Sequence, residues 1–272
     1  LVLDPEGAIV EQFSSNPVDR ALASAMGDEV PETQLRDIKK TLEAAAKDKN
    51  IDHVLLVTHG ISSMGPATVR EFAAALRKFK ESKKPIYAMA DGYDQRGYLL
   101  AAQADKVFMD PEGAVLLEGM GRYRTYFRVA FDKYGIEPHL FRVGEYKSAG
   151  EPYIRSDASP EAKEADLHWM GDVWQRHLAD IAKARGLEAT DLSAMVDGYV
   201  TSISAAGGDL GKLAIEQKLV DQLMTRQQLR DFMIEKGAAD DDDNAFRQID
   251  FDSYLARLNA LPQFPGSNQI AI

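Results

Sequence analysis

Residues 53–57 read His-Val-Leu-Leu-Val, and the predicted fold depends on this stretch. A short apolar run of this kind is typical of a strand buried on both faces of a parallel sheet. Residues 85–90 (Pro-Ile-Tyr-Ala-Met-Ala) and 106–109 (Lys-Val-Phe-Met) repeat the pattern, and helical spacing lies between the runs at about 66–82 and 94–104. The alternation predicts an α/β protein built from βα units with parallel strand pairing.

The sequence of residues 1–49 predicts two strands and two helices. Residues 1–3 and 8–10 are short apolar runs separated by Asp-Pro-Glu-Gly, so we expect a strand pair joined by a turn. Helical spacing follows at 17–27 and 31–49. In the second helix, Pro31 stands where a first turn accepts proline.

The region after the core predicts more helix. We expect a helix near 122–134, a strand over 139–143, and a long helix to about residue 185 that begins with Ser159 as N-cap and Pro160 as first residue. Further helices over 189–236 would complete a helical extension that covers about 159–236.

The sequences at the two ends of the chain predict how it is divided into repeats. We expect residues 1–267 to form one repeat. Residues 268–272 (Asn-Gln-Ile-Ala-Ile) are similar to residues 1–3 and are expected to be the first strand of a second repeat outside this chain. The chain starts at a leucine inside an apolar run, so a leader or membrane anchor is expected upstream.

Composition excludes several classes of function. The 272 residues include 32 Lys and Arg against 43 Asp and Glu, a formal net charge of −11, so no nucleic-acid partner is expected. Cysteine is absent, which excludes disulfides, thiolate metal sites and cysteine nucleophiles. No apolar run approaches the roughly 20 residues of a membrane-spanning helix.

Familiar catalytic and metal-binding motifs are missing from the sequence. It contains no Gly-x-Ser-x-Gly elbow, no His-Glu-x-x-His and no phosphate-binding loop. None of the five histidines is spaced for a metal site, so neither a metal nor another cofactor is expected. His59-Gly60 follows the first buried strand, where it would be either part of a binding loop or a plain turn.

Residues 141–153 form a segment of unusual composition around one lysine. They read Phe-Arg-Val-Gly-Glu-Tyr-Lys-Ser-Ala-Gly-Glu-Pro-Tyr. Lys147 could act as a general base if desolvation lowered its pKa enough to leave a neutral amine. Glu145 and Glu151 would oppose that shift if they pointed inward. The alternative is an ordinary solvated lysine, which is the more frequent case.

Residues 141–166 closely resemble the signal peptide peptidase family, also called protease IV, in its long double-repeat form. Residues 83–88, 97–101 and 104–107 resemble the strand, helix and strand around that family's nucleophile turn, and Leu-Val-Asp at 219–221 resembles a late element. The resemblance implies a fold like that of ClpP and crotonase, a spiral of ββα units with additional helices.

The resemblance also implies a divided catalytic site. The family uses a serine nucleophile and a lysine general base. In the long form the amino-terminal half supplies the lysine and the carboxy-terminal half the serine. This chain is similar to the amino-terminal half, in which Lys147 takes the general-base position. Gln95 stands where the other half has its serine, and residues 59–62 are a degenerate oxyanion turn. The chain alone is therefore expected to be inert.

Partners and location follow from the same resemblance. It implies cleaved signal peptides and other hydrophobic peptides as substrates, a homo-oligomer with four subunits, and attachment to the bacterial inner membrane with the catalytic part on the periplasmic side. One alternative is a catalytically silent scaffold or binding half of the same fold, in which Lys147 is a surface residue. Another is a crotonase-type enzyme acting on acyl thioesters.

Overall fold

The larger of two parallel sheets contains the predicted buried strands. The computed structural model describes residues 1–27, 30–240 and 245–260. In this part the larger sheet has the strand order β1 (Val2–Leu3), β4 (Val54–Val57), β6 (Ile86–Ala90), β7 (Lys106–Met109) and β8 (Gln222–Leu223). All four pairings are parallel, so the predicted α/β class is confirmed.

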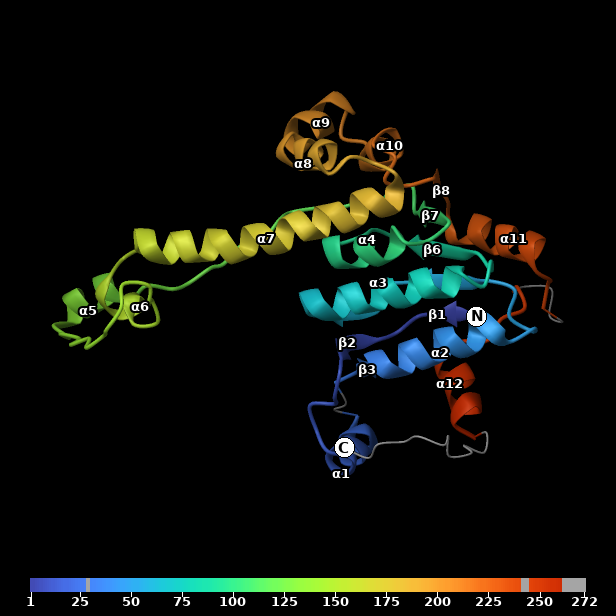
Figure 1. The fold of residues 1–272 in the computed structure, drawn as a ribbon, viewed down its shortest axis with the longest axis horizontal. Coiled ribbons are helices and arrows are strands. Elements are labelled where there is room, and N and C mark those ends of the chain that lie inside the picture. The colour runs from blue at the N-terminus through green and yellow to red at the C-terminus, as the bar shows by residue number, and fades with distance from the viewer. Residues whose placement is uncertain (28–29, 241–244, 261–272) are drawn as a thin grey trace. The chain divides into compact units, whose positions relative to one another are not determined.

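Alternate residues of these strands face two different layers. Leu55, Tyr87 and Phe108 share one cluster with Leu229 and Met233, which belong to helix α11 (Arg226–Lys236). The intervening residues point to the opposite face. There α2 (Leu35–Lys47), α3 (Pro66–Lys80) and α4 (Gln95–Ala101) lie side by side in front of the strands (Figure 1). Because both faces are covered, the strands are apolar on both sides.

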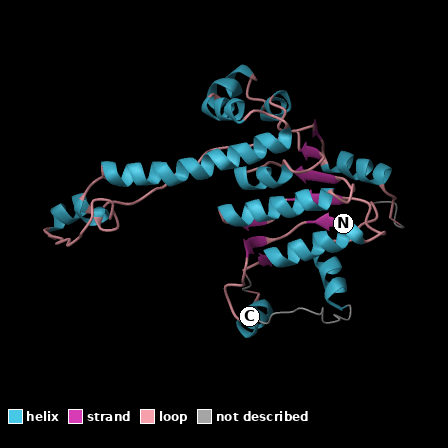
Figure 2. Ribbon diagram, in the orientation of Figure 1, coloured by secondary structure: helices cyan, strands magenta, loops and turns pink. Residues whose placement is uncertain are grey.

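A smaller parallel sheet gives the fold its ββα character. Its order is β3 (Glu32–Gln34), β2 (Gly7–Val10) and β5 (Ile61–Ser63). Successive units place the first strand in the larger sheet and the second in the smaller sheet before a helix follows, as in β4–β5–α3 (Figure 2). This repeated unit matches the spiral of ββα units that the resemblance implied.

Most of the remaining helices were predicted, but those at 151–154 and 251–260 were not, and the helix expected near 122–134 begins only at Arg128. These remaining helices are α1 (Pro17–Met26), α5 (Arg128–Tyr134), α6 (Glu151–Ile154), α7 (Pro160–Arg185), α8 (Ala189–Asp197), α9 (Tyr199–Ala205), α10 (Leu210–Glu216) and α12 (Phe251–Ala260). The predicted start of the long helix is confirmed, because Ser159 Oγ accepts a 3.1 Å hydrogen bond from the Ala162 amide. The predicted boundary after residue 267 lies outside the described residues.

Three predicted details of secondary structure are wrong. Strands β1 and β2 do not pair with each other, because β2 lies between β3 and β5 in the other sheet. Pro31 precedes strand β3, and α2 begins only at Leu35. Residues 139–143 form no strand and are mostly exposed.

The chain divides into two compact units. The first comprises residues 1–117 and 181–272 and contains every strand of the described part of the chain, and the second comprises residues 118–180. In the second unit, all of whose residues are described, the buried apolar side chains are Ala162 and Leu178. This unit therefore has little hydrophobic core of its own.

Candidate functional site

The turn after β6 is where the resemblance places a nucleophile in related sequences. Gln95 is the first residue of α4 and is half-buried. Asp94 caps this helix, since its Oδ1 accepts a 2.7 Å hydrogen bond from the Gly97 amide. A carboxamide is no nucleophile, so this turn has the geometry of a strand-to-helix elbow without the reacting group.

Close packing fixes the shape of this turn. A Cβ atom added to Gly97 would lie 3.0 Å from Asp94 Oδ1 and 3.2 Å from Thr58 Oγ1, the latter at the end of β4. The Tyr93 hydroxyl donates a 2.7 Å hydrogen bond to the Phe108 carbonyl oxygen, and burial raises the pKa of this phenol. The turn is thus held from two neighbouring strands.

His59-Gly60 forms the connection between β4 and β5. The Gly60 carbonyl oxygen accepts a 2.9 Å hydrogen bond from the Gly7 amide, and the His59 side chain is exposed. Close by in the first unit, Arg226 and Asp91 form a 2.6 Å ion pair. The hydrogen bond from Arg226 lowers the pKa of the Asp91 carboxyl. The backbone hydrogen bond between Gly60 and Gly7 and the exposure of the His59 side chain favour the interpretation of His59-Gly60 as a structural turn.

Lys147 lies in a loop of the second unit, between α5 and α6. Its side chain is exposed, and its ammonium has no hydrogen-bond or ion-pair partner among the residues that the structure describes. Its backbone is held: the Lys147 amide donates to the Gly144 carbonyl oxygen at 3.4 Å, and the Lys147 carbonyl oxygen accepts from Arg142 Nη1 at 3.1 Å.

The sequence did not predict that Glu151 is buried and paired with Arg142. On the sequence alone this residue is a carboxylate that could oppose a pKa shift of Lys147, whereas the Glu151 side chain is fully buried and bonded to Arg142 and Ser159. The signal in the sequence was weak, because an arginine and a glutamate nine positions apart in a loop have no regular spacing.

Many large apolar side chains of the second unit are exposed. Beside the lysine loop, the exposed Phe127 and Tyr153 and the half-buried Phe131 stack with ring centroids 6.1 to 6.2 Å apart. The exposed set also includes Tyr123, Val129, Tyr134, Ile136, Leu140, Phe141, Val143, Tyr146, Leu167 and Trp169. So many exposed large apolar side chains in one small unit are typical of a region that another protein segment covers.

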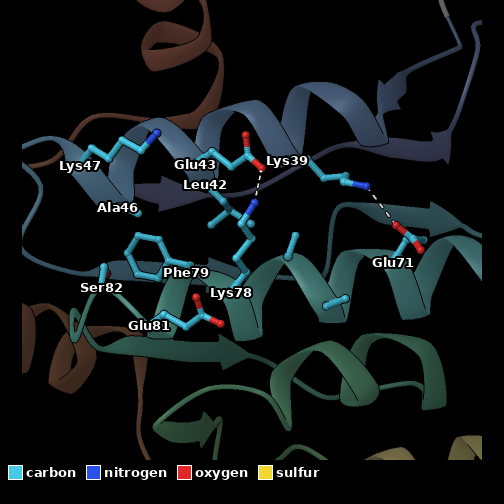
Figure 3. Close-up of a pocket in the computed structure, with 12 residues that line it drawn as sticks. Lys39, Leu42, Glu43, Ala46, Lys47, Glu71, Lys78, Phe79, Glu81 and Ser82 are labelled. Carbon is cyan, nitrogen blue, oxygen red and sulfur yellow. Dashed lines mark hydrogen bonds and ion pairs between the residues drawn. The ribbon is translucent and has the colours of Figure 1, made fainter.

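A surface groove of about 690 Å³ lies between α2 and α3 (Figure 3). Leu42 and Phe79 are among its lining residues, and lysine–glutamate pairs line it too, with Nζ–Oε distances of 3.0 Å for Lys39–Glu71 and 2.7 Å for Lys78–Glu43. These charges already neutralise one another. The groove therefore presents neither a net charge nor a reactive pair for a ligand.

No helix in the part of the chain that the structure describes combines the length and apolar character needed to span a bilayer. No three histidine, aspartate or glutamate side chains within it are grouped so that they could hold a metal ion.

The fold and the turn define an α/β protein of the ββα-repeat type, in which the elbow after β6 carries no nucleophile. The chain belongs to peptidase family S49, whose profile matches residues 78–239. The matched range includes the elbow, the lysine loop and the helices that follow.

Two bacterial relatives match almost the whole chain. It is 33% identical over 264 residues to Protease 4 of Salmonella typhi and 30% identical over 254 residues to Protease 4 of Haemophilus influenzae. These matches cover 96% and 93% of this chain but 43% and 41% of the relatives. The chain therefore spans less than half the length of these relatives.

More distant similarity extends to a plant protein and to solved structures. The chloroplastic serine protease SPPA of Arabidopsis thaliana is 27% identical over 169 residues, which are 62% of this chain and 25% of that protein. A membrane-bound stomatin-specific protease has a TM-score of 0.41 and 12% identity, covering 85% of this chain and 82% of its own. An enoyl-CoA hydratase/carnitine racemase from Magnetospirillum magneticum has a TM-score of 0.38 and 15% identity, covering 82% and 67%.

Proposed function

We propose that this chain is the amino-terminal, lysine-contributing half of a membrane-associated serine–lysine peptidase that degrades cleaved signal peptides and other hydrophobic peptides. The observation that carries the proposal is the match to Protease 4, which covers 96% of this chain but only 43% of the relative. In this proposal Lys147 is the general base, and the nucleophilic serine belongs to a carboxy-terminal half.

The residues of the turn after β6 support the proposed division of the catalytic site between two halves of the protein. Gln95 stands at the turn where a nucleophile would be exposed, and Asp94 holds that turn closed as a helix cap. A general base can take a proton only from a hydroxyl within about 3 Å. The serine that Lys147 would activate must therefore come from another segment, brought to the loop when the two halves assemble.

The exposed side chains of the second unit support such an assembly. A lysine acts as a base near neutral pH only where desolvation leaves its amine neutral, and Lys147 is exposed in this chain. Docking of another repeat onto the apolar surface around the loop would supply the missing desolvation. The same contacts would support a homo-oligomer, for which we propose four subunits. The bacterial inner membrane, with this part on the periplasmic side, is the proposed location.

One observation favours the alternative of a catalytically silent scaffold half. The ammonium of Lys147 is exposed and unbonded among the described residues, which is also how an ordinary surface lysine looks. In that case the apolar surface of the second unit would serve assembly alone.

The Lys147→Ala variant of the full-length protein separates the two candidates. If Lys147 is the general base, hydrolysis of an apolar peptide falls by several orders of magnitude, while the oligomer measured by light scattering stays intact. Lys133→Ala is the matched control, since Lys133 is an exposed lysine of the same unit and its variant should keep the parental rate. If the Lys147→Ala protein cleaves at the parental rate, Lys147 is not the general base and this half is a catalytically silent scaffold.

A further inference from the structure

The carboxylate of Glu151 is a buried charge in a unit that buries little else. Its side chain is fully buried, with a relative exposure of 0%. Oε2 accepts a 3.1 Å hydrogen bond from the Ser159 amide, and Oε1 lies 3.4 Å from Arg142 Nη1. Removing the Arg142 guanidinium would leave the Glu151 carboxylate buried without its counter-charge, which lowers the stability of the fold.

The balance of these contacts keeps Glu151 ionised. Burial alone would raise the pKa of the Glu151 carboxyl, but the hydrogen bonds from Ser159 and Arg142 outweigh it, so the pKa lies below its usual value. The charge that results is the counter-charge of Arg142, whose side chain is 35% exposed.

Arg142 connects this buried carboxylate to the backbone of the lysine loop. The same Nη1 that approaches Glu151 donates a 3.1 Å hydrogen bond to the Lys147 carbonyl oxygen. The next carbonyl oxygen, that of Ser148, accepts a 3.0 Å hydrogen bond from Arg124 Nη1. Two guanidinium groups thus hold the peptide units on either side of Ser148, that is Lys147–Ser148 and Ser148–Ala149.

A polar network is the main means of fixing this loop. Apart from Ala162 and Leu178, the second unit buries no apolar side chain, and all of its residues are described. A buried ion pair adds little net stability, but here its guanidinium also bonds the loop backbone at Lys147. From this we infer that Arg142 and Glu151 are positioning residues that set the place of Lys147 for proton transfer. The inference rests on the proposed function of Lys147 as general base.

The Glu151→Gln variant of the full-length protein tests the positioning role. The glutamine keeps the shape but presents Arg142 with a neutral side chain. Because a misplacement of about 1 Å can cost about 100-fold in rate, we expect kcat for an apolar peptide to fall about 10- to 100-fold, with KM changed less than threefold. A displaced, better solvated amine also has a higher pKa, so the midpoint of the rising limb of the kcat/KM profile should move to higher pH.

A second variant covers the case in which Glu151→Gln does not fold. Arg142→Lys keeps the positive charge but replaces the rigid, planar guanidinium by an ammonium on a flexible stem, so no nitrogen is held at the place of Arg142 Nη1. We expect a smaller fall in kcat and a shift of the pH midpoint in the same direction. Glu43→Gln is the matched control, since Glu43 forms a 2.7 Å ion pair with Lys78 on an exposed surface of the first unit. It should keep both kcat and the midpoint.

The outcomes distinguish failure of the positioning role of Arg142 and Glu151 from failure of the general-base role of Lys147. If Lys147→Ala is inactive while folded Glu151→Gln and Arg142→Lys keep the parental kcat and pH midpoint, the positioning role is wrong and the general base stands. Loss of activity in proportion to unfolded protein, with an unmoved midpoint, would show a purely structural role and would also overturn it. If Lys147→Ala keeps the parental rate, the general base is wrong, and the positioning role falls with it.

Discussion

The Tyr98 hydroxyl donates a 2.7 Å hydrogen bond to the Leu219 carbonyl oxygen, 121 residues further along the chain. Tyr98 is fully buried in α4, directly behind the elbow, and Leu219 precedes the edge strand β8. Burial raises the pKa of this phenol far above its usual value, so the hydroxyl stays protonated and remains a donor. One bond therefore ties the elbow helix to a segment that reaches the sheet late in the sequence.

We predict that Tyr98→Phe lowers the free energy of unfolding by about 1 to 3 kcal/mol, because it leaves the Leu219 carbonyl oxygen buried without a partner. Urea unfolding followed by circular dichroism measures the difference. Tyr134→Phe is the control, since the Tyr134 side chain is exposed and its variant should match the parental stability. Equal midpoints for all three proteins would contradict the prediction.

A second prediction concerns acid stability at Asp221, which accepts a 2.7 Å hydrogen bond from the Val107 amide and lies 3.0 Å from Arg185 Nη1. Burial would raise the pKa of the Asp221 carboxyl, but the hydrogen bonds from Arg185 and Val107 outweigh it, so the pKa lies below its usual value of 3.8. A carboxyl with a lowered folded-state pKa stabilises the fold above its unfolded-state pKa, and that stability is lost as the pH falls through the folded-state pKa.

The Asp221→Asn variant should therefore be less stable than the parent by about 1.5 kcal/mol at pH 7. The difference should shrink as the pH falls below 3.8. Urea unfolding of both proteins between pH 7 and pH 3 measures it. A difference that stays constant over this range would show that the charge of Asp221 has no part in the effect.

A third prediction compares two glycines with left-handed backbone. Gly7 has φ +72° and Gly27 has φ +75°, but a Cβ added to Gly7 would overlap the Pro31 carbonyl oxygen, whereas one added to Gly27 meets no described atom within 4 Å. Gly27→Ala should cost about 1 kcal/mol for the backbone conformation alone. Gly7→Ala should cost clearly more, because β2 and the segment before β3 must separate. Thermal unfolding of both variants checks the order, and a reversed order would contradict it.

A fourth prediction concerns the chain by itself. If the serine belongs to another half, residues 1–272 alone should hydrolyse no peptide and should take up no serine-directed fluorophosphonate label. The full-length protein, treated in parallel, should be labelled. Labelling of the isolated chain would place a reactive serine within it and would contradict the division of the site.

Sequence periodicity predicted the central strands because burial on both faces leaves a clear apolar signal. Leu55, Tyr87 and Phe108 face one layer, and their neighbours along each strand face the other. The same reasoning failed for residues 1–10, since a turn composition at 4–7 says nothing about which sheet each flanking strand joins. In the structure Gly7 turns the chain into the smaller sheet instead.

The candidate site was predictable only in part. The resemblance predicts Lys147 as general base and Gln95 at the nucleophile position, and both stay predictions. The Arg142–Glu151 pair was not predictable, because it depends on how a loop folds back on itself, which no spacing rule describes. Residues 139–143 show the same limit. Their β-like composition predicted a strand, yet a strand needs a partner for its backbone groups, and Phe141 and Val143 are exposed instead.

The second unit is an insertion between residues 117 and 181, and every strand of the described chain lies outside it. Residues 118–180 therefore take part in no strand pairing of the described chain. Evolutionary change in residues 118–180 can therefore alter the surroundings of Lys147 while the strand pairings stay the same, with only the proposed catalytic and positioning residues held constant.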